Sequence, residues 1–402
     1  MQLKVFTLNC WGIKYVSKDR EERIRAIAEE LATGKYDIVC LQEVWLTCDY
    51  NLIKDKSSGV LPYAHYFYSG VTGSGVCILS KYPIEEVFFH KWAINGYIHK
   101  IHHGDWFGGK GVGLCQLRIE NFIVNVYSAH LHAEYNRASD EYLVHRILQA
   151  FNTAQFIKQT SAHADLVILA GDLNTEPNDL AYRIITSVGG LTDSFGEAGP
   201  VPDSMVATNE ALDNSYTSKS RISKNIPGIR IDYIMYHTGK NACAKVDKYQ
   251  LPLPKFVPNT QYSYSDHEAV CVTFNVKRND TMDEGEAAGN DCGSKVNTIK
   301  AAVLEESMDL CTDFLKVLRN HQWVYLIMVF VFLVILAMAL VADIPYGYHV
   351  LYSIFKSLIT IVIFYCFLMG TLWNYIEKHA IMATIAGMDI SLATHRKVHK
   401  DL

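Results

Sequence analysis

The chain has 402 residues, of which 50% are hydrophobic, and a formal net charge of -5. This charge weighs against nucleic acid as a partner, because nucleic-acid-binding proteins usually present a basic face. The ten cysteines show no C-x-x-C or cysteine/histidine zinc spacing, which excludes the common zinc motifs and indicates free thiols in a reducing compartment.

Five polar clusters lie beside apolar runs that have the length of buried strands. In chain order the polar residues are Asn9, Glu43, His130, the pair Asp172 and Asn174, and the pair Asp266 and His267. The first four clusters follow runs at 3–8, 36–41, 122–127 and 165–170, and the last precedes a run at 268–272. Because strand ends present fixed polar groups to a cleft, these residues are candidates for one site.

Helical runs separate the strands. Apolar residues at helical spacing predict helices at 18–32 and 140–161. This alternation predicts an α/β sandwich, and residues 1–277 are long enough for one domain with a substantial core. We expect the polar segment 194–226 to form a long surface loop and the aromatic run 66–68 to pack within a strand.

The residue types suit metal-assisted hydrolysis of a phosphodiester. Mg²⁺ prefers carboxylate oxygens, waters and substrate phosphate as ligands, and Glu43 and Asn9 fit that need. Hydrolysis also requires a base that activates water, and His267 is the natural base, with Asp266 beside it near the metal. Asp232, in another strand-like run, is available to orient the second nitrogen of His267.

Each of these residues also has an ordinary explanation when taken alone. Gly171-Asp172-Leu173-Asn174 is a common type of strand-to-turn corner. Glu43 suits a surface position, His130 a structural hydrogen bond, and Asp232 an ion pair with Arg230. The functional interpretation therefore depends on the joint pattern, in which all the polar residues lie at the ends of apolar runs.

As a set, these motifs resemble the endonuclease/exonuclease/phosphatase superfamily, which has the DNase I-like fold. The resemblance covers about residues 1–277 and implies a four-layer α/β sandwich. It is carried by Asn9, Gln42-Glu43, Ser128-Ala129-His130, Gly171-Asp172-Leu173-Asn174, Arg230-Ile231-Asp232-Tyr233 and Ser265-Asp266-His267. The motifs are specific together and weak one by one.

Two further stretches resemble the neutral sphingomyelinases within that superfamily. They are His102–Gly111, which is rich in glycine, and His130–Arg137. The resemblance implies that Asp105 and Lys110 switch the first stretch between inactive and active states. Trp106 and Phe107 are apolar groups suited to contact lipid or a choline group.

The resemblance also implies an activity and further roles. The expected reaction is Mg²⁺-dependent hydrolysis of sphingomyelin to ceramide and phosphocholine. His130 and Asn174 are expected to stabilise the charge on the pentacoordinate phosphorus, and Asp172 to position the water or share the base role. The donor that protonates the leaving alkoxide is not assigned.

Two hydrophobic runs near the end of the chain, at 323–342 and 350–373, are long enough to cross a bilayer. The short loop between them predicts a transmembrane hairpin, which makes the chain an integral membrane protein. Basic residues on both flanks, such as Lys316 and Lys378, predict that the flanks and the catalytic domain are cytosolic. We expect the endoplasmic reticulum or a related internal membrane as the location.

The remaining segments complete the expected domain organisation. A flexible linker at 278–294 precedes a juxtamembrane amphipathic helix at 295–322. Residues 374–402 form the predicted cytosolic tail. The expected partner is the lipid bilayer. A homo-oligomer through the transmembrane region is compatible with the sequence, which does not fix the oligomeric state.

Three other functions remain open from the sequence. The same chemistry suits lysophosphatidylcholine or lyso-platelet-activating factor, because headgroup and phosphate are the same. A tethered nuclease shares the motif core, although the hairpin and the Asp105–Lys110 stretch count against it. A catalytically idle scaffold is disfavoured because every expected catalytic position is filled.

Overall fold

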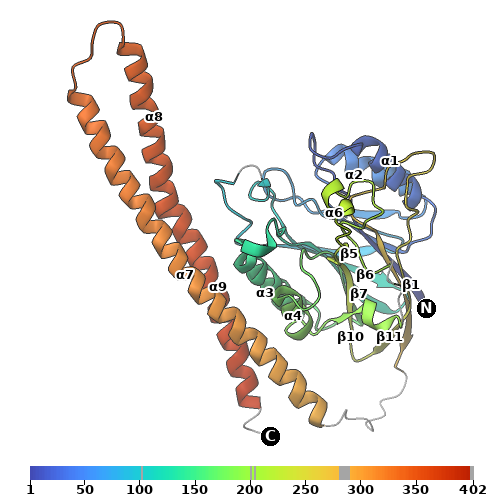
Figure 1. Ribbon diagram of the computed structural model, residues 1–402. Helices are drawn as coiled ribbons and strands as arrows, with labels where there is room; N and C mark the ends of the chain where they lie inside the picture. The colour runs from blue at the N-terminus through green and yellow to red at the C-terminus, as the bar shows by residue number, and fades with distance from the viewer. Residues whose placement is uncertain (101–102, 200–201, 203–204, 280–289, 399–402) are drawn as a thin grey trace. The chain divides into compact units, whose positions relative to one another are not determined.

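The computed structural model describes residues 1–100, 103–199, 202, 205–279 and 290–398. It divides into two units, Met1–Val303 and Leu304–Leu402, which are considered separately (Figure 1). Part of the predicted linker, residues 280–289, lies outside the described residues.

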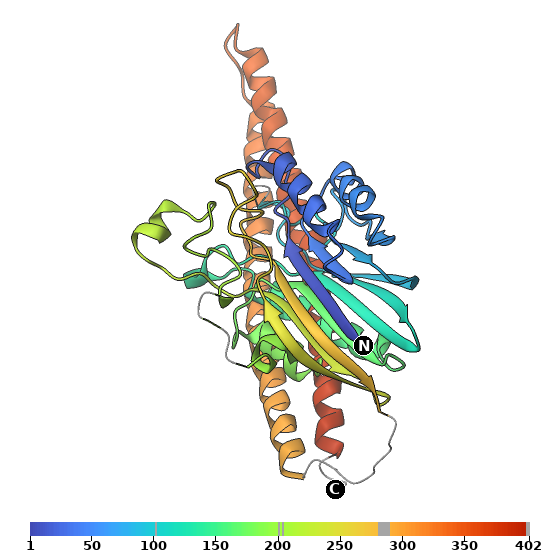
Figure 2. The ribbon, with the colours of Figure 1, turned by 90° about the vertical axis from the view of Figure 1, so that its right-hand side faces the viewer.

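The first unit contains two six-stranded mixed sheets (Figure 2). The first sheet has the order β11-β12-β1-β2-β4-β3 and the second has the order β5-β6-β7-β8-β10-β9. The strands of the first sheet are β1 (Gln2–Asn9), β2 (Ile38–Gln42), β3 (Tyr63–Tyr66), β4 (Cys77–Ser80), β11 (Ala242–Gln250) and β12 (Val270–Arg278). Those of the second are β5 (Ile84–Lys91), β6 (Gly111–Ile119), β7 (Phe122–His130), β8 (Leu166–Asp172), β9 (Thr192–Asp193) and β10 (Asp232–Thr238).

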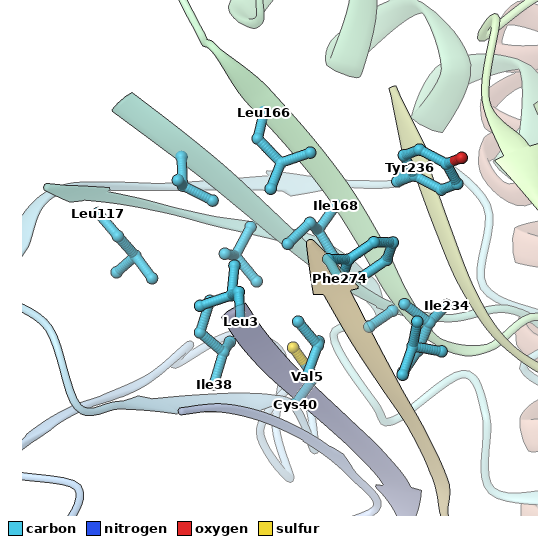
Figure 3. Packing of buried hydrophobic residues seen from close by; sticks show 14 of the residues in the cluster. Leu3, Val5, Ile38, Cys40, Leu117, Leu166, Ile168, Ile234, Tyr236 and Phe274 are labelled. Carbon is cyan, nitrogen blue, oxygen red and sulfur yellow. The ribbon is translucent and has the colours of Figure 1, made fainter. Parts of the chain in front are cut away.

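The two sheets pack face to face over one hydrophobic core (Figure 3). Leu3 and Val5 of β1 enter this core, where they meet residues of the second sheet such as Ile168. Phe6 and Leu8 lie in a second apolar cluster. Because successive strand residues point to opposite faces, a strand buried on both faces has the continuous apolar run that the sequence shows.

Helices cover the outer faces of both sheets. The second apolar cluster joins β1 and β2 to Ile24 and Ile27 of α1. On the other sheet, the Tyr127 ring of β7 lies 5.8 Å from the Phe156 ring of α3. The predicted four-layer sandwich is therefore confirmed. The helices are α1 (Arg20–Leu31), α2 (Thr47–Ser57), α3 (Leu143–Thr160), α4 (Leu180–Ser187) and the 3-10 turn η2 (Arg137–Ser139).

The segment at 194–226, predicted to be a surface loop, is helical in two places. It contains the short helices α5 (Ser194–Glu197) and α6 (Lys219–Ser223). The side chains of Asp193 and Ser218 cap these helices by accepting hydrogen bonds from the amides of Phe195 and Arg221. Short capped turns of this kind need no apolar periodicity, so the periodicity argument did not reveal them.

The C-terminal helices form two long apolar segments that are compatible with a transmembrane hairpin. The helices are α7 (Asn290–Val341), α8 (His349–Leu368), the π-helical turn η4 (Met369–Trp373) and α9 (Asn374–Val398). Candidate membrane spans lie in Thr298–Val341 and His349–Thr394. In the most apolar stretch of each, only 6% and 11% of the residues, respectively, are buried within the protein.

The helical segments continue beyond the predicted bounds, because α7 is one helix of 52 residues and α8 is followed without a break by η4 and α9. The 52 residues of α7 make a rod of about 78 Å at 1.5 Å per residue, more than twice the ~30 Å thickness of a bilayer core. The helix begins at Asn290, inside the predicted linker, and does not break at the predicted boundary between residues 322 and 323. The predicted tail from residue 374 is helical as far as Val398.

Candidate active site

Strand register brings the polar strand ends together. In the second sheet, Asp172 pairs with His130 on one side and with Asp232 on the other. In the first sheet, Asn9 pairs with Gln42, so that Glu43 follows directly beside it. Asp266 and His267 lie just before β12, which runs antiparallel to β1. The ends of both sheets thus supply one polar cluster.

Asn9 joins the two sheets at this cluster. Its side-chain nitrogen donates hydrogen bonds to Glu43 Oε1 at 3.0 Å and to Asp172 Oδ2 at 2.9 Å. Its side-chain oxygen accepts from the Trp11 amide at 2.9 Å, which fixes the orientation of the amide group. Asn9 therefore presents nitrogen to both carboxylates. Its oxygen contacts the Trp11 amide and not Glu43, and the contribution of Asn9 to a metal site stays a prediction.

His267 forms a buried pair with Asp232. The distance from His267 Nδ1 to Asp232 Oδ2 is 2.8 Å, and His267 Nε2 lies 3.9 Å from Asp172 Oδ2. Burial favours the neutral imidazole, but the Asp232 and Asp172 carboxylates outweigh it and raise the pKa of His267 well above its usual value. A carboxylate that holds one ring nitrogen and leaves the other free is the arrangement of an oriented proton acceptor.

Two neighbours of this pair, Asp172 and His130, have shifted pKa values. Burial, reinforced by Asp232, raises the pKa of Asp172 to about 6. Burial, reinforced by Lys110, lowers the pKa of His130 well below its usual value, so His130 is neutral at physiological pH. His130 Nε2 lies 3.6 Å from Asp172 Oδ2 and 3.3 Å from Lys110 Nζ.

The other predicted site residues lie at the edge of the cluster. The Asn174 amide donates to Asp172 Oδ1 at 2.9 Å, and its side-chain nitrogen donates to the Leu131 carbonyl at 3.0 Å. Asn174 has a positive φ of 44°, which asparagine tolerates better than most residues. Asp266 is half-buried and accepts a hydrogen bond from Ser265 Oγ at 3.2 Å.

The donor set fits a hard divalent cation at Glu43. Burial, and then repulsion by Asp266, raises the pKa of the Glu43 carboxyl, so a cation beside it relieves both penalties. Among the described residues, Asp172, Asp232 and His267 also place ligand atoms within 4.8 Å of one another. The hydrogen bond between His267 and Asp232 already occupies His267 Nδ1. We therefore favour Glu43 as the oxygen donor to the cation.

The glycine-rich segment brings Asp105 and Lys110 into direct contact with this cluster. Lys110 Nζ lies 2.6 Å from Asp105 Oδ1 and 3.3 Å from the Leu131 carbonyl oxygen. Asp105 Oδ2 accepts a hydrogen bond from the Tyr135 hydroxyl at 2.6 Å. Both charged side chains are almost fully buried. Although burial opposes ionisation, Lys110 and His132 hold the pKa of Asp105 well below its usual value.

A cavity of about 730 Å³ opens onto Glu43, Lys110 and His130. Its aromatic lining consists of Trp45, Tyr66, Tyr68, Phe107 and Tyr135, together with His103. Such a mixture of aromatic walls and a few converging polar groups is typical of a small-molecule site. Trp106 is not among the lining residues and instead contacts the Phe107 ring at 5.0 Å.

The prediction that the aromatic run at 66–68 packs within a strand is only partly correct. Phe67 is buried in the core between the sheets, whereas Tyr66 and Tyr68 line the cavity. Strand alternation accounts for this division. Trp45 and Tyr135 were missed as cavity residues because they come from separate loops whose approach depends on the tertiary fold.

Arg23 of α1 was also missed, and it connects two loops of the site. Its guanidinium is fully buried and donates to the carbonyls of Cys10 at 2.8 Å, Trp11 at 2.8 Å and Tyr264 at 3.1 Å. Cys10 follows Asn9, and Tyr264 precedes Asp266 and His267. Arg23 therefore fixes the backbone beside both Asn9 and Asp266 in the polar cluster.

Replacing Arg23 by leucine is expected to lower the free energy of unfolding by about 1–3 kcal/mol, because buried carbonyls lose their donors. This change is measured by unfolding the full chain in urea and monitoring the transition of the catalytic unit by fluorescence. Arg25→Leu is the matched control, since Arg25 lies on the same helix and is exposed. Equal effects of the two substitutions would show that Arg23 does not hold these loops.

The comparisons with known proteins agree with this geometry. Residues 6–267 match the model of the Endonuclease/Exonuclease/phosphatase family. The chain is 39% identical to a "Putative neutral sphingomyelinase" of Drosophila melanogaster, over 98% of this chain and 97% of that protein. It is also 39% identical to "Sphingomyelin phosphodiesterase 2" of Mus musculus, over 76% of this chain and 72% of that protein.

Solved structures have the same fold at low sequence identity. Sphingomyelinase C from Streptomyces griseocarneus has a TM-score of 0.51 and 20% identity, over 68% of this chain and all of that chain. A beta toxin mutant from Staphylococcus aureus with bound magnesium ions has a TM-score of 0.50 and 19% identity, over 68% of this chain and 99% of that chain. The chain is a phosphodiesterase that belongs to the neutral sphingomyelinases of the endonuclease/exonuclease/phosphatase family.

Proposed function

We propose that this protein hydrolyses sphingomyelin to ceramide and phosphocholine with Mg²⁺, at the cytosolic face of a membrane. The observation that carries the proposal is the His267–Asp232 pair, 2.8 Å apart, in the polar cluster that shares Glu43 and His130 with the aromatic cavity. The names of the relatives supply the substrate class. The magnesium ions in the beta toxin structure and the Glu43 donor set support the metal.

In this proposal the neutral form of His267 is the general base, and a bound cation would favour that form by opposing the carboxylates that raise its pKa. Its Nε2 accepts a proton from the attacking water, while Asp232 holds Nδ1 and stabilises the imidazolium that forms. Asp172, 3.9 Å from Nε2, positions the water. Glu43 would hold the metal ion, with Asp266 nearby, and Asn9 orients the Glu43 carboxylate. When bound, Mg²⁺ supplies Lewis-acid polarisation of the phosphate.

The contact between Lys110 and His130 gives the proposed switch a physical meaning. His130 Nε2 faces the Lys110 ammonium at 3.3 Å and so accepts a hydrogen bond from it. In that arrangement His130 cannot donate from Nε2 to a phosphate oxygen. If Lys110 moves with Asp105, both Lys110 and His130 become available to stabilise the charge on phosphorus, together with the free N–H of Asn174.

The aromatic side of the cavity suits the choline group. A quaternary ammonium is attracted to aromatic faces by cation–π interaction, and Trp45, Tyr66 and Tyr68 supply aromatic rings to the cavity lining. The same headgroup is present in lysophosphatidylcholine and lyso-platelet-activating factor, which remain the alternative substrates. The aromatic wall does not distinguish these lipids, because they differ only beyond the phosphate.

The proposed location depends on the charges around the apolar helices. Lys316 and Arg319 precede the first apolar run and Lys378 follows the second. In the sequence of the connecting loop, the only charged residue is Asp343. Positively charged flanks favour the cytosolic side of a membrane, which supports a cytosolic catalytic unit. An internal membrane such as the endoplasmic reticulum is the proposed compartment.

Phosphocholine release from mixed micelles tests the substrate and the metal together. We expect the full chain to release phosphocholine from sphingomyelin with Mg²⁺ and not with a chelator. A parallel assay with lyso-platelet-activating factor gives the ratio of kcat/KM values for the two lipids. A higher kcat/KM for the lyso lipid would establish the alternative substrate. Absence of release from both lipids, with cleavage of DNA instead, would establish the tethered nuclease.

A further inference from the structure

Large apolar side chains project into solvent from two loops of the catalytic unit. The loop after β1 exposes 91% of Tyr15 and 66% of Val16. The loop after β3 exposes 70% of Tyr68 and 80% of Val71. Single exposed apolar residues are common on soluble proteins, but several on adjacent loops indicate an interaction surface.

Both loops surround the mouth of the catalytic cavity. Ile13 and Lys14 line the cavity from the first loop, and Tyr68 and Val71 line it from the second. Glu43 lies in the same cavity. We call the surface formed by Ile13, Tyr15, Val16, Tyr68 and Val71 the entrance surface. A molecule that covers it lies directly over the route to the catalytic groups.

The first loop is held in a defined conformation. The amides of Val16 and Ser17 donate to the Ile13 carbonyl at 3.3 Å and 3.0 Å, and Ser17 Oγ accepts from the Ile13 amide at 2.9 Å. Tyr15 has a positive φ of 70°, which is strained for a bulky aromatic residue. The loop thus keeps an aromatic side chain exposed in a backbone conformation that disfavours it.

The second loop is anchored from the other side of the cavity. The Val71 amide donates to the Phe107 carbonyl at 3.1 Å, and Gly70 forms a β-bridge with Gly108 of the glycine-rich segment. A Cβ on Gly70 would lie 2.3 Å from the Gly109 amide nitrogen, so this close approach requires glycine. The exposed Val71 side chain is therefore carried on a fixed part of the site.

We propose that the entrance surface docks on a lipid bilayer and inserts Tyr15, Val16 and Val71 into its interfacial layer. Tyrosine favours that layer because its ring is apolar and its hydroxyl meets water, and the valine side chains add apolar area that insertion removes from water. Lys14 places its ammonium 4.8 Å from the Tyr15 ring centre, where it can reach lipid phosphates while its stem contacts the apolar layer. The two apolar C-terminal helices keep a bilayer near the catalytic unit.

This inference rests on the proposed function in one respect, since it supposes that the substrate is a membrane lipid. Docking at the mouth delivers such a substrate without passage through water. A water-soluble phosphocholine diester needs no docking. The two substrates therefore separate docking from catalysis.

The test uses the full chain reconstituted in vesicles of phosphatidylcholine and sphingomyelin. The variant is Tyr15→Asn with Val16→Ser, because asparagine tolerates the positive φ and neither residue lines the cavity. For each protein we measure hydrolysis of bilayer sphingomyelin and of soluble p-nitrophenyl phosphocholine. The ratio of the two rates cancels differences in protein orientation. The matched control is Val87→Ser with Phe88→Ser on β5, where the side chains are 44% and 59% exposed away from the cavity.

We expect the Tyr15/Val16 variant to lose at least tenfold in this ratio and to keep its rate on the soluble diester, with no change in the control. An unchanged ratio would overturn the proposal. An equal loss on both substrates would also overturn it, because it would assign the loop to the site or the fold.

A second readout does not depend on the activity. A photo-crosslinking amino acid at position 15 is expected to attach to phospholipid, and the same group at position 88 is not. Crosslinking of position 15 to protein alone would replace the bilayer by a protein partner. If the wild type hydrolyses no choline phosphodiester, the proposed function fails and the crosslink still decides the docking surface.

Discussion

Replacing His267 by alanine is expected to lower kcat for phosphodiester hydrolysis by about 100- to 10,000-fold, the usual contribution of a positioned general base. The reason is geometric, since His267 is held by Asp232 at 2.8 Å and has Nε2 near Asp172. Steady-state kinetics with sphingomyelin measure the loss. A kcat within tenfold of the wild type would remove His267 from the base role.

Asp232→Asn tests the same pair without leaving a cavity. The asparagine amide donates to Nδ1 and so places the imidazole proton on Nε2, which blocks proton acceptance. We expect kcat to fall by at least 100-fold while the KM for sphingomyelin changes little. Asp193→Asn is the matched control, since Asp193 forms a buried ion pair with Arg230 at 2.7 Å outside the catalytic cluster. Similar losses of kcat in both variants would point to a general structural effect.

Asp105→Ala is expected to lower the free energy of unfolding by about 3–5 kcal/mol, because it leaves the buried Lys110 ammonium without its partner. The lowered pKa of Asp105 also determines how this contribution to the free energy of unfolding depends on pH. Its stabilising contribution is present above the unfolded carboxyl pKa of about 3.9 and is lost as pH falls towards the folded value. Urea unfolding between pH 3 and pH 7 therefore detects the onset of this loss, as a fall in the free energy of unfolding below about pH 4 that is larger in the wild type than in the variant.

The double variant Asp105→Ala with Lys110→Met separates folding from catalysis. Removing both charges is expected to restore much of the stability, since no unpaired ion remains buried. Hydrolysis is expected to stay low, because the Lys110 ammonium is no longer available to stabilise the charge on phosphorus. A double variant with wild-type kcat would show that this ion pair serves folding alone.

The strand ends explain why much of the site was predictable from the sequence. Buried strands leave continuous apolar runs, and a polar residue after such a run marks a fixed position such as Asn9 or Asp172. The sequence does not specify the direction of an amide group. The contact of the Asn9 oxygen with the Trp11 amide depends on a loop conformation that no periodicity records.

The helix boundaries show a different kind of limit. Apolar composition changes near residue 322, but α7 continues because no proline or glycine interrupts it between Leu304 and Val341. The helix ends before Pro345, where the sequence does contain a break signal. Apolar composition thus locates the candidate membrane-spanning segments, whereas helix-breaking residues determine where the helices end.

Hydrolysis of sphingomyelin vesicles in water enriched in oxygen-18 tests the central claim most directly. If His267 activates water for attack on phosphorus, the full chain with Mg²⁺ places one labelled oxygen in phosphocholine and none in ceramide. His267→Ala then loses the labelled product. Label in the ceramide hydroxyl, or labelled phosphocholine at the wild-type rate from His267→Ala, would contradict the mechanism built on the His267–Asp232 pair.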